Sequence, residues 1–363
     1  MKGEIDIKLA RKFAPALLKW HWSENKRQMP WKGEKDPYKI WLSEIILQQT
    51  RVEQGLNYYQ RFLEAFPDIH QLARATDNRV YKLWEGLGYY SRCKNLLLTA
   101  RYISKEKKGE FPRQYEEILA LKGVGTYTAA AISSFAYNEP HAVVDGNVFR
   151  VIARVFGISQ PTDSTPGKKY FTAVANQLLD KKQPGIYNQA LMDFGALICK
   201  PQSPLCPGCV FRSDCYAYRH HKINELPVKL KSILIKKRYF NYLVLEYDHK
   251  VLIRERTEKD IWQHLYEFCL IETSRLTQAP KIIASAIASG LLKNKNFELL
   301  NQTAAVKQLL SHQLISGRFI HIRLKTAPLL KNGFEQVPIQ KIDAYPFPKL
   351  IKNSLADIFK EKK

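Results

Sequence analysis

The sequence has 363 residues, of which 45% are hydrophobic, and its 57 lysine and arginine residues outnumber 34 aspartate and glutamate residues, giving a formal charge of +23. The length predicts two or three domains, and no apolar run is long enough for a membrane span, so we expect a soluble protein with no membrane partner. The charge favours a polyanionic partner, with nucleic acid as the first candidate, although a basic surface can also be merely solvated.

Residues 31–137 predict an all-helical fold. Apolar residues such as Trp41, Ile45 and Ile46 recur at helical spacing, and short Gly, Pro and Asp breaks separate the segments. Glu44 lies within this apolar face, where burial would raise its pKa and let it keep a proton near neutral pH. Taken alone, such a glutamate is more often a surface or salt-bridged residue.

A short turn connects two apolar helical segments, 115–121 and 127–135. The turn consists of Lys122, Gly123, Val124 and Gly125. Its glycines permit a tight bend, and the next helix presents free N–H groups that suit a phosphate. The pattern is typical of a helix-hairpin-helix that binds the DNA backbone, although a Gly-x-Gly motif alone often marks only a turn.

Asp145 is a lone acid between the apolar run 142–144 and Gly146. The glycine permits a sharp turn that would aim the carboxylate at a cleft. Asp145 could also be the N-cap of a helix that starts near Val148. Capping and catalysis do not exclude each other.

Four cysteines lie close together in the sequence: Cys199, Cys206, Cys209 and Cys215. Thiolates bind zinc or iron–sulfur clusters, and structural zinc usually uses two Cys-x-x-Cys pairs. Only Cys206 and Cys209 form such a pair here, which favours one [4Fe-4S] cluster. Disulfides would need an oxidising compartment, and Met1–Asp6 contains no secretory signal. We interpret Cys93 and Cys269 as small core residues.

The pattern changes after the cysteines. Residues 222–237 predict a basic linker, because they contain Pro227 and lack an apolar period. A domain with strands follows. Its predicted strands are 240–247, 250–256 and 319–324, and its predicted helix is 281–292.

Together, these features resemble the helix-hairpin-helix superfamily of DNA glycosylases, and the cysteine spacing is similar to that of its iron–sulfur members. Two families fit: the MutY-type adenine DNA glycosylases, and the endonuclease III-type enzymes that excise oxidised pyrimidines and cut the strand. Endonuclease III-type enzymes carry a lysine two residues past the second hairpin glycine, which forms a Schiff base. This chain has Tyr127 there. Segments 43–50 and 86–92 also resemble the MutY-type pattern, and the matches span about residues 30–215.

The C-terminal part also resembles MutY-type enzymes, which append a Nudix-like domain that senses oxidised guanine. Segment 262–268 is similar to part of that domain. Residues 275–295 contain no acid to hold the magnesium ion of a working Nudix hydrolase, so we expect binding without hydrolysis. Leu310-Ser311-His312 resembles the Phe-Ser-His loop of the family. The resemblance implies that Ser311 and His312 recognise 8-oxoguanine, while Leu310 departs from the usual aromatic residue.

The fold class implied is multidomain, with an all-α helix-hairpin-helix DNA glycosylase domain that carries an iron–sulfur cluster, followed by an α/β Nudix-like domain. The glycosylase domain would span residues 1–221 and the Nudix-like domain residues 238–363, on either side of the linker. Within the first domain, we expect a helical barrel lobe with the hairpin at 30–137. Residues 1–29 and 138–221 would form a cluster lobe.

The resemblance also implies roles for single residues. Glu44 would protonate the departing adenine, and Asp145 would stabilise the oxocarbenium-like sugar. Tyr127 and Asn147 would orient these two groups.

Other residues are implied to contact the DNA. Gln49 and Tyr89 would fill or wedge the space left by the extruded nucleotide, and Trp31 and Gln189 would line the base pocket. Candidates for phosphate contacts, besides the hairpin, are Lys200, Arg212, Arg150, Arg154, Lys168 and Lys169.

The predicted function is that of a monofunctional base excision repair enzyme that flips out and hydrolyses adenine paired with 8-oxoguanine or guanine in double-stranded DNA. We expect a monomer in the cytoplasm, associated with the nucleoid as in bacteria. The alternatives are an endonuclease III-like oxidised-pyrimidine glycosylase with AP lyase activity, and a non-catalytic iron–sulfur DNA-binding protein.

Overall fold

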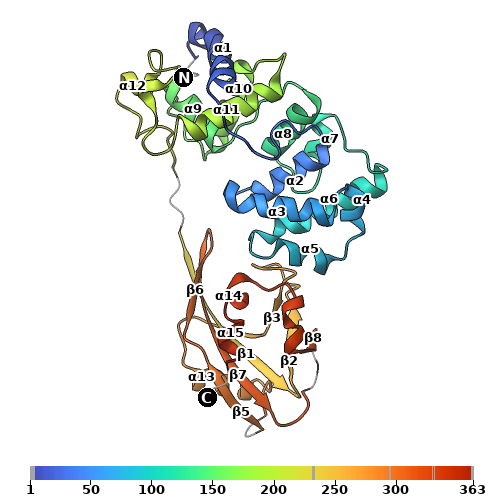
Figure 1. The fold of residues 1–363 in the computed structure, drawn as a ribbon. Coiled ribbons are helices and arrows are strands. Elements are labelled where there is room, and N and C mark those ends of the chain that lie inside the picture. The colour runs from blue at the N-terminus through green and yellow to red at the C-terminus, as the bar shows by residue number, and fades with distance from the viewer. Residues whose placement is uncertain (1–4, 231–233, 294–295, 329, 331, 361–363) are drawn as a thin grey trace. The chain divides into compact units, whose positions relative to one another are not determined.

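The computed structural model describes residues 5–230, 234–293, 296–328, 330 and 332–360 (Figure 1). Its contacts divide the chain into two compact units. Unit 1 consists of Met1–Arg74 and Asn95–Lys231, and unit 2 consists of Ala75–Lys94 and Ser232–Lys363.

Unit 1 is helical, as the apolar spacing predicts. Its elements are α1 (Ile7–Ser23), α2 (Pro37–Leu47), α3 (Val52–Ala65), α4 (Ile69–Arg74), most of α6 (Tyr90–Glu106), α7 (Tyr115–Leu119), α8 (Thr126–Tyr137), α9 (Gly146–Phe156), α10 (Thr165–Leu178), α11 (Pro184–Leu197), the 3₁₀ turn η1 (Cys206–Gly208) and α12 (Tyr216–Arg219).

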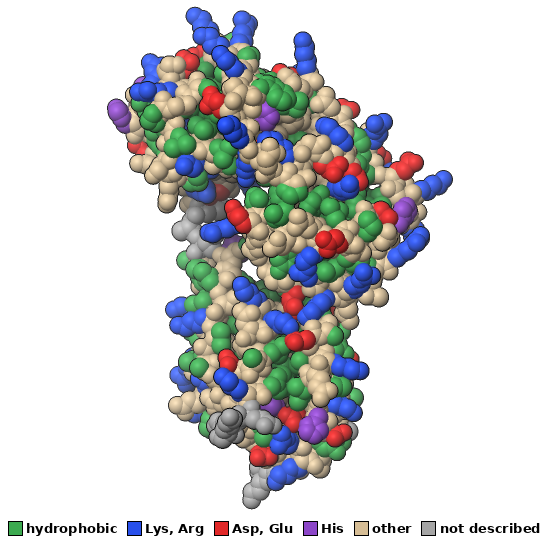
Figure 2. All heavy atoms as spheres, in the orientation of Figure 1, with side chains coloured by type: hydrophobic (Ala, Val, Ile, Leu, Met, Phe, Trp, Pro, Cys, Tyr) green, Lys and Arg blue, Asp and Glu red, His purple; other side chains and the backbone are tan. Residues whose placement is uncertain are grey.

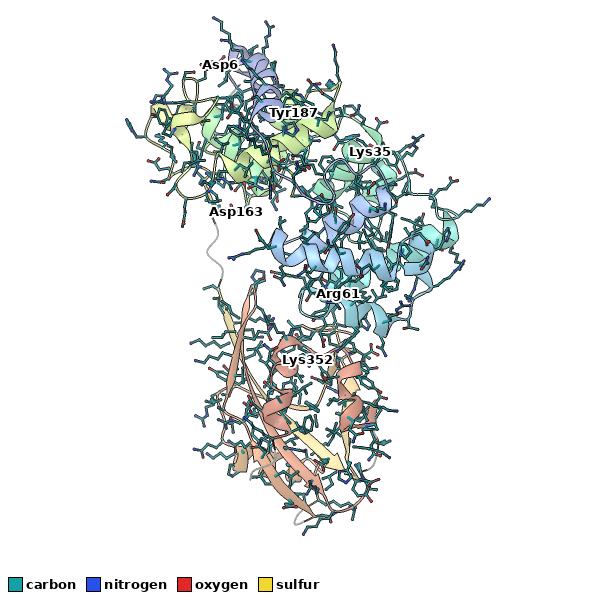
Figure 3. The ribbon with its side chains drawn as sticks, in the orientation of Figure 1. Asp6, Lys35, Arg61, Asp163, Tyr187 and Lys352 are labelled. Carbon is teal, nitrogen blue, oxygen red and sulfur yellow. The ribbon has the colours of Figure 1, made fainter. Side chains whose placement is uncertain are left out.

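The N-terminal helix α1 packs with α9, α10 and α11, which come more than a hundred residues later (Figure 1). Asp6, labelled in Figure 3, begins α1 by accepting the backbone N–H groups of Lys8 and Leu9. Phe13 stacks on Phe211 at 4.6 Å between ring centroids, so α1 also contacts the cysteine-rich segment. Burial of such apolar side chains is the main driving force for this lobe.

Small residues bring α2 and α8 close together. Ala129, Ala130 and Ala131 of α8 are buried, and α2 packs against α8. Because alanine side chains are short, the polar residues of the two helices reach one another within the interface.

The segment predicted as a linker contacts unit 1 over much of its length. Leu226 is buried and its carbonyl oxygen accepts a hydrogen bond from Arg154 Nε at 3.0 Å. The carbonyl oxygen of Val228 accepts from the Thr162 N–H at 3.0 Å, and the Leu230 N–H donates to Asp163. The first strand begins at Lys236. Residues 231–233 of the predicted linker lie outside the described residues.

Unit 2 begins with the short helix α5 (Asp77–Trp84) and the first turn of α6. Its later elements are β1 (Lys236–Tyr247), β2 (Lys250–Glu255), β3 (Tyr266–Glu267), β4 (Cys269–Thr273), α13 (Ala279–Ala288), β5 (Phe297–Gln302), β6 (Val306–Leu309), β7 (Gln313–Leu324), β8 (Phe334–Pro338), the 3₁₀ turn η2 (Ile339–Ala344), α14 (Lys349–Lys352) and α15 (Leu355–Ile358).

Among the described residues, the strands of unit 2 form one eight-stranded mixed sheet. Its main path is β3-β2-β1-β7-β5, with β4 paired to β1, β6 to β7 and β8 to β2. Of the strand pairs in the described part of the chain, only the central one, β1 with β7, is parallel, and it runs from Lys236 opposite Gln313 to Glu246 opposite Arg323. Antiparallel pairs surround this centre.

The predicted strand pair is confirmed. β1 and β2 pair antiparallel around a two-residue turn, in which Asp248 and His249 have φ of 50° and 55°. Such a turn matches the twist of the two strands. The predicted helix is also confirmed, although α13 runs from Ala279 to Ala288 and ends four residues earlier than expected.

Helix α13 covers one face of the sheet. Ile282 and Ala286 pack against Leu243, Ile320 and Ile322 from β1 and β7. This is the arrangement expected of a half-buried sheet, whose alternate residues face the core. The two units therefore have the predicted fold classes, helical and then mixed α and β.

Candidate active site

Helix α2 carries Glu44 into the interior of unit 1. Asp36 caps the helix through the Tyr38 N–H at 2.9 Å, and Pro37 occupies the first turn. Most side chains of α2 are buried, and Glu44 itself is only 7% exposed. Burial raises the pKa of Glu44 to about 7, and the negative charge of Asp145 acts in the same direction.

Tyr127 reaches Glu44 from the first turn of α8. The two side chains form a hydrogen bond that partly opposes the rise in the Glu44 pKa. Burial, with the two nearby carboxylates, raises the pKa of Tyr127 well above its ordinary value, so its hydroxyl remains a neutral donor. The hydroxyl also lies 3.8 Å from Met192 Sδ.

Asp145 is the N-cap of α9, as one of its two predicted roles requires. Its Oδ1 accepts the Val148 N–H at 2.7 Å and its Oδ2 accepts from Asn147 Nδ2 at 2.7 Å. Burial raises the pKa of Asp145 above its ordinary value, although these donors and the charge of Arg150 oppose the rise. Several hydrogen-bond donors thus stabilise the ionised form of Asp145, whereas Glu44 has one. If the two carboxyl groups hold one proton between them, that proton is more stable on Glu44.

A buried arginine connects Asp145 with the cysteine segment. Arg150 donates from Nη2 to Asn147 Oδ1 at 2.8 Å and from Nε to the Cys199 carbonyl oxygen at 2.6 Å. Asn147 in turn donates to Asp145. The absence of a side chain at Gly195 permits this approach, because a Cβ there would lie 2.6 Å from Asn147 Cβ.

These side chains meet in one pocket of unit 1 with a volume of about 650 Å³. It brings together most of the predicted catalytic and base-contacting residues. They are Glu44, Tyr127, Asp145, Asn147, Gly125, Gln49, Trp31 and Gln189. A smaller cavity of about 160 Å³ shares Trp31, Glu44 and Gln189 as lining residues. Two carboxyl groups from different helices therefore face one space.

The raised pKa of Glu44 predicts a pH-dependent stability. Between pH 4.5 and about 7 the native protein holds a proton that the unfolded chain has lost, so the free energy of unfolding falls as the pH rises through this window. The change is on the order of 3 kcal/mol. We expect Glu44→Gln to unfold at higher urea concentration than the parent protein at pH 8 and to differ much less at pH 5. A stability difference independent of pH would contradict the assignment.

The predicted helix-hairpin-helix is formed by α7 and α8. Gly123 has a φ of +76°, and a Cβ at this position would lie 2.6 Å from Asn95 Cβ. Val124 is buried beneath the turn, while Lys122 is exposed. Gly125 caps α8, and nothing lies within 4 Å of the position of a Cβ there, so the amides at the start of α8 are open to a ligand.

The two hairpin glycines should respond differently to substitution by alanine. Gly123→Ala puts a Cβ into a left-handed backbone and against Asn95, which should cost about 1–3 kcal/mol of stability. Gly125→Ala should cost less than about 1 kcal/mol, because the cap has an ordinary φ of −99°. Both methyl groups should weaken duplex DNA binding. Thermal unfolding and a binding titration measure the two effects, and equal stability losses would contradict this account.

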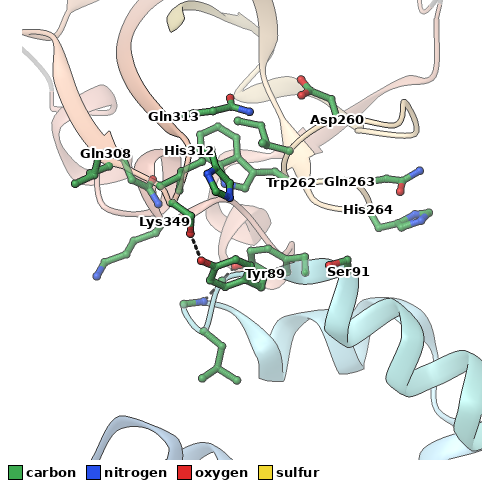
Figure 4. A pocket seen from close by; sticks show the side chains of 18 of the residues that line it. Tyr89, Ser91, Asp260, Trp262, Gln263, His264, Gln308, His312, Gln313 and Lys349 are labelled. Atoms are coloured by element: carbon green, nitrogen blue, oxygen red, sulfur yellow. Dashed lines mark hydrogen bonds between the residues drawn. The ribbon is translucent and has the colours of Figure 1, made fainter. Parts of the chain in front are cut away.

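Tyr89 and the Leu310-Ser311-His312 turn lie in a different pocket, of about 570 Å³, within unit 2 (Figure 4). The Tyr89 hydroxyl is hydrogen-bonded to Ser311 Oγ. Tyr89 is 43% exposed and has a φ of 48°, and Gln49 in the other pocket has a φ of 56°. Strained backbone at two exposed, non-glycine residues is typical of functional loops.

The four clustered cysteines are free thiols that interact electrostatically with one another. Burial raises the pKa of Cys209 to about 12, so a cation is needed to hold it as a thiolate. Arg154 Nη1 lies 3.6 Å from Cys199 Sγ, and the Cys215 thiol donates to the Arg154 carbonyl oxygen. Within the described part of the chain, no three His, Cys, Asp or Glu side chains form a group that could hold a single metal ion. The other two cysteines, Cys93 and Cys269, are buried in the core as predicted.

Two of the predicted phosphate contacts are wrong. Arg150 and Arg154 are 8% and 4% exposed, and their guanidinium groups bind backbone carbonyl groups. They stabilise the cysteine segment from inside and cannot reach a phosphate. Lys168, Lys169 and Arg212 are exposed, as a phosphate contact requires.

Sequence reasoning missed Asp193, an entirely buried carboxylate of α11. It binds Arg27, Lys32, Asn25 and Gln189, most of which line the pockets around Glu44. Its sequence context, between Met192 and Phe194 on an apolar helix, is the same signal that indicated burial for Glu44.

The sequence of the chain matches a class of base excision DNA repair protein. Residues 42–176 match the family described as HhH-GPD superfamily base excision DNA repair protein, and residues 241–357 match the NUDIX domain. Among solved structures, a thermostable thymine-DNA glycosylase is 30% identical with a TM-score of 0.55, covering 59% of this chain and 98% of that one.

Relatives that align with more of the chain share the name of one enzyme, adenine DNA glycosylase. The adenine DNA glycosylase of Buchnera aphidicola subsp. Baizongia pistaciae is 34% identical over 327 residues, which is 88% of this chain and 89% of that protein. The adenine DNA glycosylase of Mus musculus is 40% identical over 61% of this chain and 44% of the mouse protein. The chain belongs to the adenine DNA glycosylase family, which confirms the resemblance seen in the sequence.

No helix in the described part of the chain has the length and hydropathy to cross a membrane.

Proposed function

We propose that this protein removes adenine paired with 8-oxoguanine or guanine in double-stranded DNA, by hydrolysis and without cutting the strand. The observation that carries the proposal is the pair of carboxyl groups, Glu44 and Asp145, which line one pocket with different hydrogen-bond environments. The identity of the chain's relatives supports adenine as the base.

The target nucleotide must first leave the base stack. The free amides at the start of α8 suit a phosphate of the DNA backbone, and the net charge of +23 attracts the polyanion. Lysine and arginine side chains project over much of the visible surface (Figure 2). Gln49, exposed at the rim of the pocket, and Tyr89 would fill the space that the nucleotide leaves.

Glu44 would then donate its proton to a ring nitrogen of adenine. With a pKa of about 7, half of the Glu44 side chains are protonated near neutral pH. The bond between the sugar C1′ and the base breaks, and its electron pair goes to the protonated base. The neutral Tyr127 hydroxyl holds the Glu44 carboxyl in position.

The sugar left behind carries positive charge. Asp145 faces the same pocket, and its donors favour the ionised form, so it would stabilise the oxocarbenium-like sugar. A water molecule then bonds to C1′, and its proton returns to the Glu44 carboxylate. The balance leaves free adenine and an abasic site, with both acids restored.

The position of Tyr127 argues against a lyase. A phenol has no amine, so Tyr127 cannot form the Schiff base through which a lysine would cut the strand. We therefore expect little covalent adduct when borohydride is added to the protein on DNA with an abasic site. An abundant adduct would favour the endonuclease III-like alternative.

The four thiols Cys199, Cys206, Cys209 and Cys215 fit a [4Fe-4S] cluster, because they are free, near one another and accompanied by Arg154. Breaking an N-glycosidic bond transfers no electron, so the reaction does not need the cluster. The cluster would instead stabilise the cysteine segment, which Arg150 connects to Asn147. We expect the purified protein to absorb visible light, and Cys199→Ser to lose this absorbance. A colourless parent protein would contradict the cofactor.

The C-terminal residues would recognise the base opposite adenine. Ser311 and His312 are exposed at the tip of the β6–β7 hairpin and share a pocket with Tyr89. Helix α13 carries no acidic side chain for magnesium, which supports binding over hydrolysis. Leu310 supplies an apolar side chain where the family usually has an aromatic ring.

The test is a single-turnover glycosylase assay with adenine opposite 8-oxoguanine, guanine or thymine. We expect excision opposite 8-oxoguanine and guanine and little opposite thymine. Binding to these duplexes with no base release would instead favour a non-catalytic DNA-binding protein. The molar mass in solution tests the proposed monomer.

A further inference from the structure

We infer that Asp193 is a positioning residue that makes the base pocket selective for a purine with an amino group at C6. The inference rests on the proposed function and concerns the orientation of one side chain, Gln189. It follows from the chemistry of a carboxylate, which accepts hydrogen bonds and cannot donate them.

Asp193 is 0% exposed, and its two oxygens are bound by donors from separate parts of the chain. Oδ1 accepts from Arg27 Nη1 at 2.9 Å and from Gln189 Nε2 at 3.1 Å. Oδ2 accepts from Asn25 Nδ2 at 2.9 Å and lies 3.3 Å from Lys32 Nζ. Such a buried carboxylate needs all of these donors to offset its lost hydration.

The contact with Gln189 settles which way its amide points. The two ends of a glutamine amide look alike, and either could in principle face Asp193. An acceptor-only carboxylate repels the carbonyl end and binds the NH₂ end. The Gln189 carbonyl oxygen is therefore turned away from Asp193, and Gln189 lines both cavities beside Glu44.

This orientation gives the pocket a hydrogen-bond acceptor at Gln189. Adenine presents an amino group at C6, which donates, whereas hypoxanthine and guanine present a carbonyl oxygen there, which accepts. A fixed acceptor at Gln189 forms a hydrogen bond with the amino group of adenine and repels the carbonyl oxygen of hypoxanthine or guanine. Sites that bury such a polar group discriminate strongly, because the wrong partner leaves it unpaired.

Asp193 also fixes the segment that carries Trp31. Arg27, Asn25 and Lys32 lie in the non-helical stretch between α1 and α2, and Lys32 additionally donates to the Arg27 carbonyl oxygen at 2.8 Å. One carboxylate of α11 thus anchors this stretch beside Gln189, so the aromatic wall and the amide of the pocket keep a constant spacing.

The experiment compares adenine with hypoxanthine, each opposite 8-oxoguanine, in single-turnover assays of the full-length protein. Asp193→Asn keeps the size of the side chain but can donate as well as accept, so both orientations of Gln189 become possible. We expect the ratio of adenine to hypoxanthine excision rates to fall at least ~10-fold relative to the parent protein. A purely structural role for Asp193 would lower the adenine and hypoxanthine excision rates by the same factor. The ratio would then be unchanged, which would overturn the inference.

Gln189→Met is the second variant, and it applies even if Asp193→Asn does not fold. It removes the amide and leaves the pairing of Asp193 with Arg27 intact. We expect the same fall in the ratio, and an unchanged ratio overturns the inference. Asp180→Asn is the matched control, because Asp180 lies before α11 begins, accepts the backbone N–H groups of Lys182 and Gln183, and is not a lining residue of either pocket. If the parent protein releases no adenine, the proposed function is wrong, and so is this inference. If it releases adenine but the ratio is unchanged in the variants, only this inference is wrong.

Discussion

Glu44→Gln should lower the single-turnover rate of adenine excision by about 10²–10⁴-fold. Glutamine keeps the size of the side chain and a hydrogen bond to Tyr127, but it has no proton to give to the base. Because Glu44 is only 7% exposed and lies inside the pocket, the surface that contacts DNA is unchanged. The affinity for a duplex with adenine opposite 8-oxoguanine should therefore stay within about twofold of the parent value, as a binding titration measures.

Glu53→Gln is the matched control for this variant. Glu53 is exposed in the first turn of α3 and does not line the pocket, so its excision rate should equal that of the parent protein. Near-normal excision by Glu44→Gln would assign the general acid to another group.

Asp145→Asn should produce a loss of similar size for a different reason. The asparagine can still cap α9 through its carbonyl oxygen, but it carries no negative charge to stabilise the sugar. Its NH₂ group would also face the NH₂ group of Asn147, whose own carbonyl oxygen is held by Arg150. We expect at least ~10²-fold slower excision, measured by single turnover on the same duplex.

Asp6→Asn separates capping from catalysis. Asp6 caps α1 as Asp145 caps α9, yet it does not line the pocket. Asparagine is as good a cap, so this variant should keep both its stability and its excision rate. If Asp145→Asn loses stability but keeps its rate of excision, then Asp145 is a cap and nothing more.

Local pattern was enough to predict the residues whose role depends on their own helix or turn. The apolar face around Glu44 indicated its burial, and the glycine after Asp145 indicated a sharp turn. The β1–β2 hairpin and α13 were likewise predicted from the spacing of apolar residues. In each case the deciding neighbours lie within one or two turns of the residue.

Residues whose role depends on distant partners could not be predicted in this way. Arg150 and Arg154 are basic and were predicted to bind phosphate, but all but one of the carbonyl groups that they bind lie 45–72 residues away. Asp193 binds Arg27 across 166 residues. The pairing of β1 with β7 is another case, because a parallel pair needs a long connection whose path no local pattern gives.

The most direct test of the central claim is the pH dependence of single-turnover adenine excision by the parent protein. In the proposed mechanism Glu44 holds the proton that reaches the base, and burial raises the pKa of Glu44 to about 7. The rate should therefore fall about tenfold per pH unit well above pH 7, where Glu44 is ionised, and should also fall at low pH, where Asp145 becomes protonated and loses the charge that stabilises the sugar. A rate that stays constant from pH 6 to pH 9 would contradict the account.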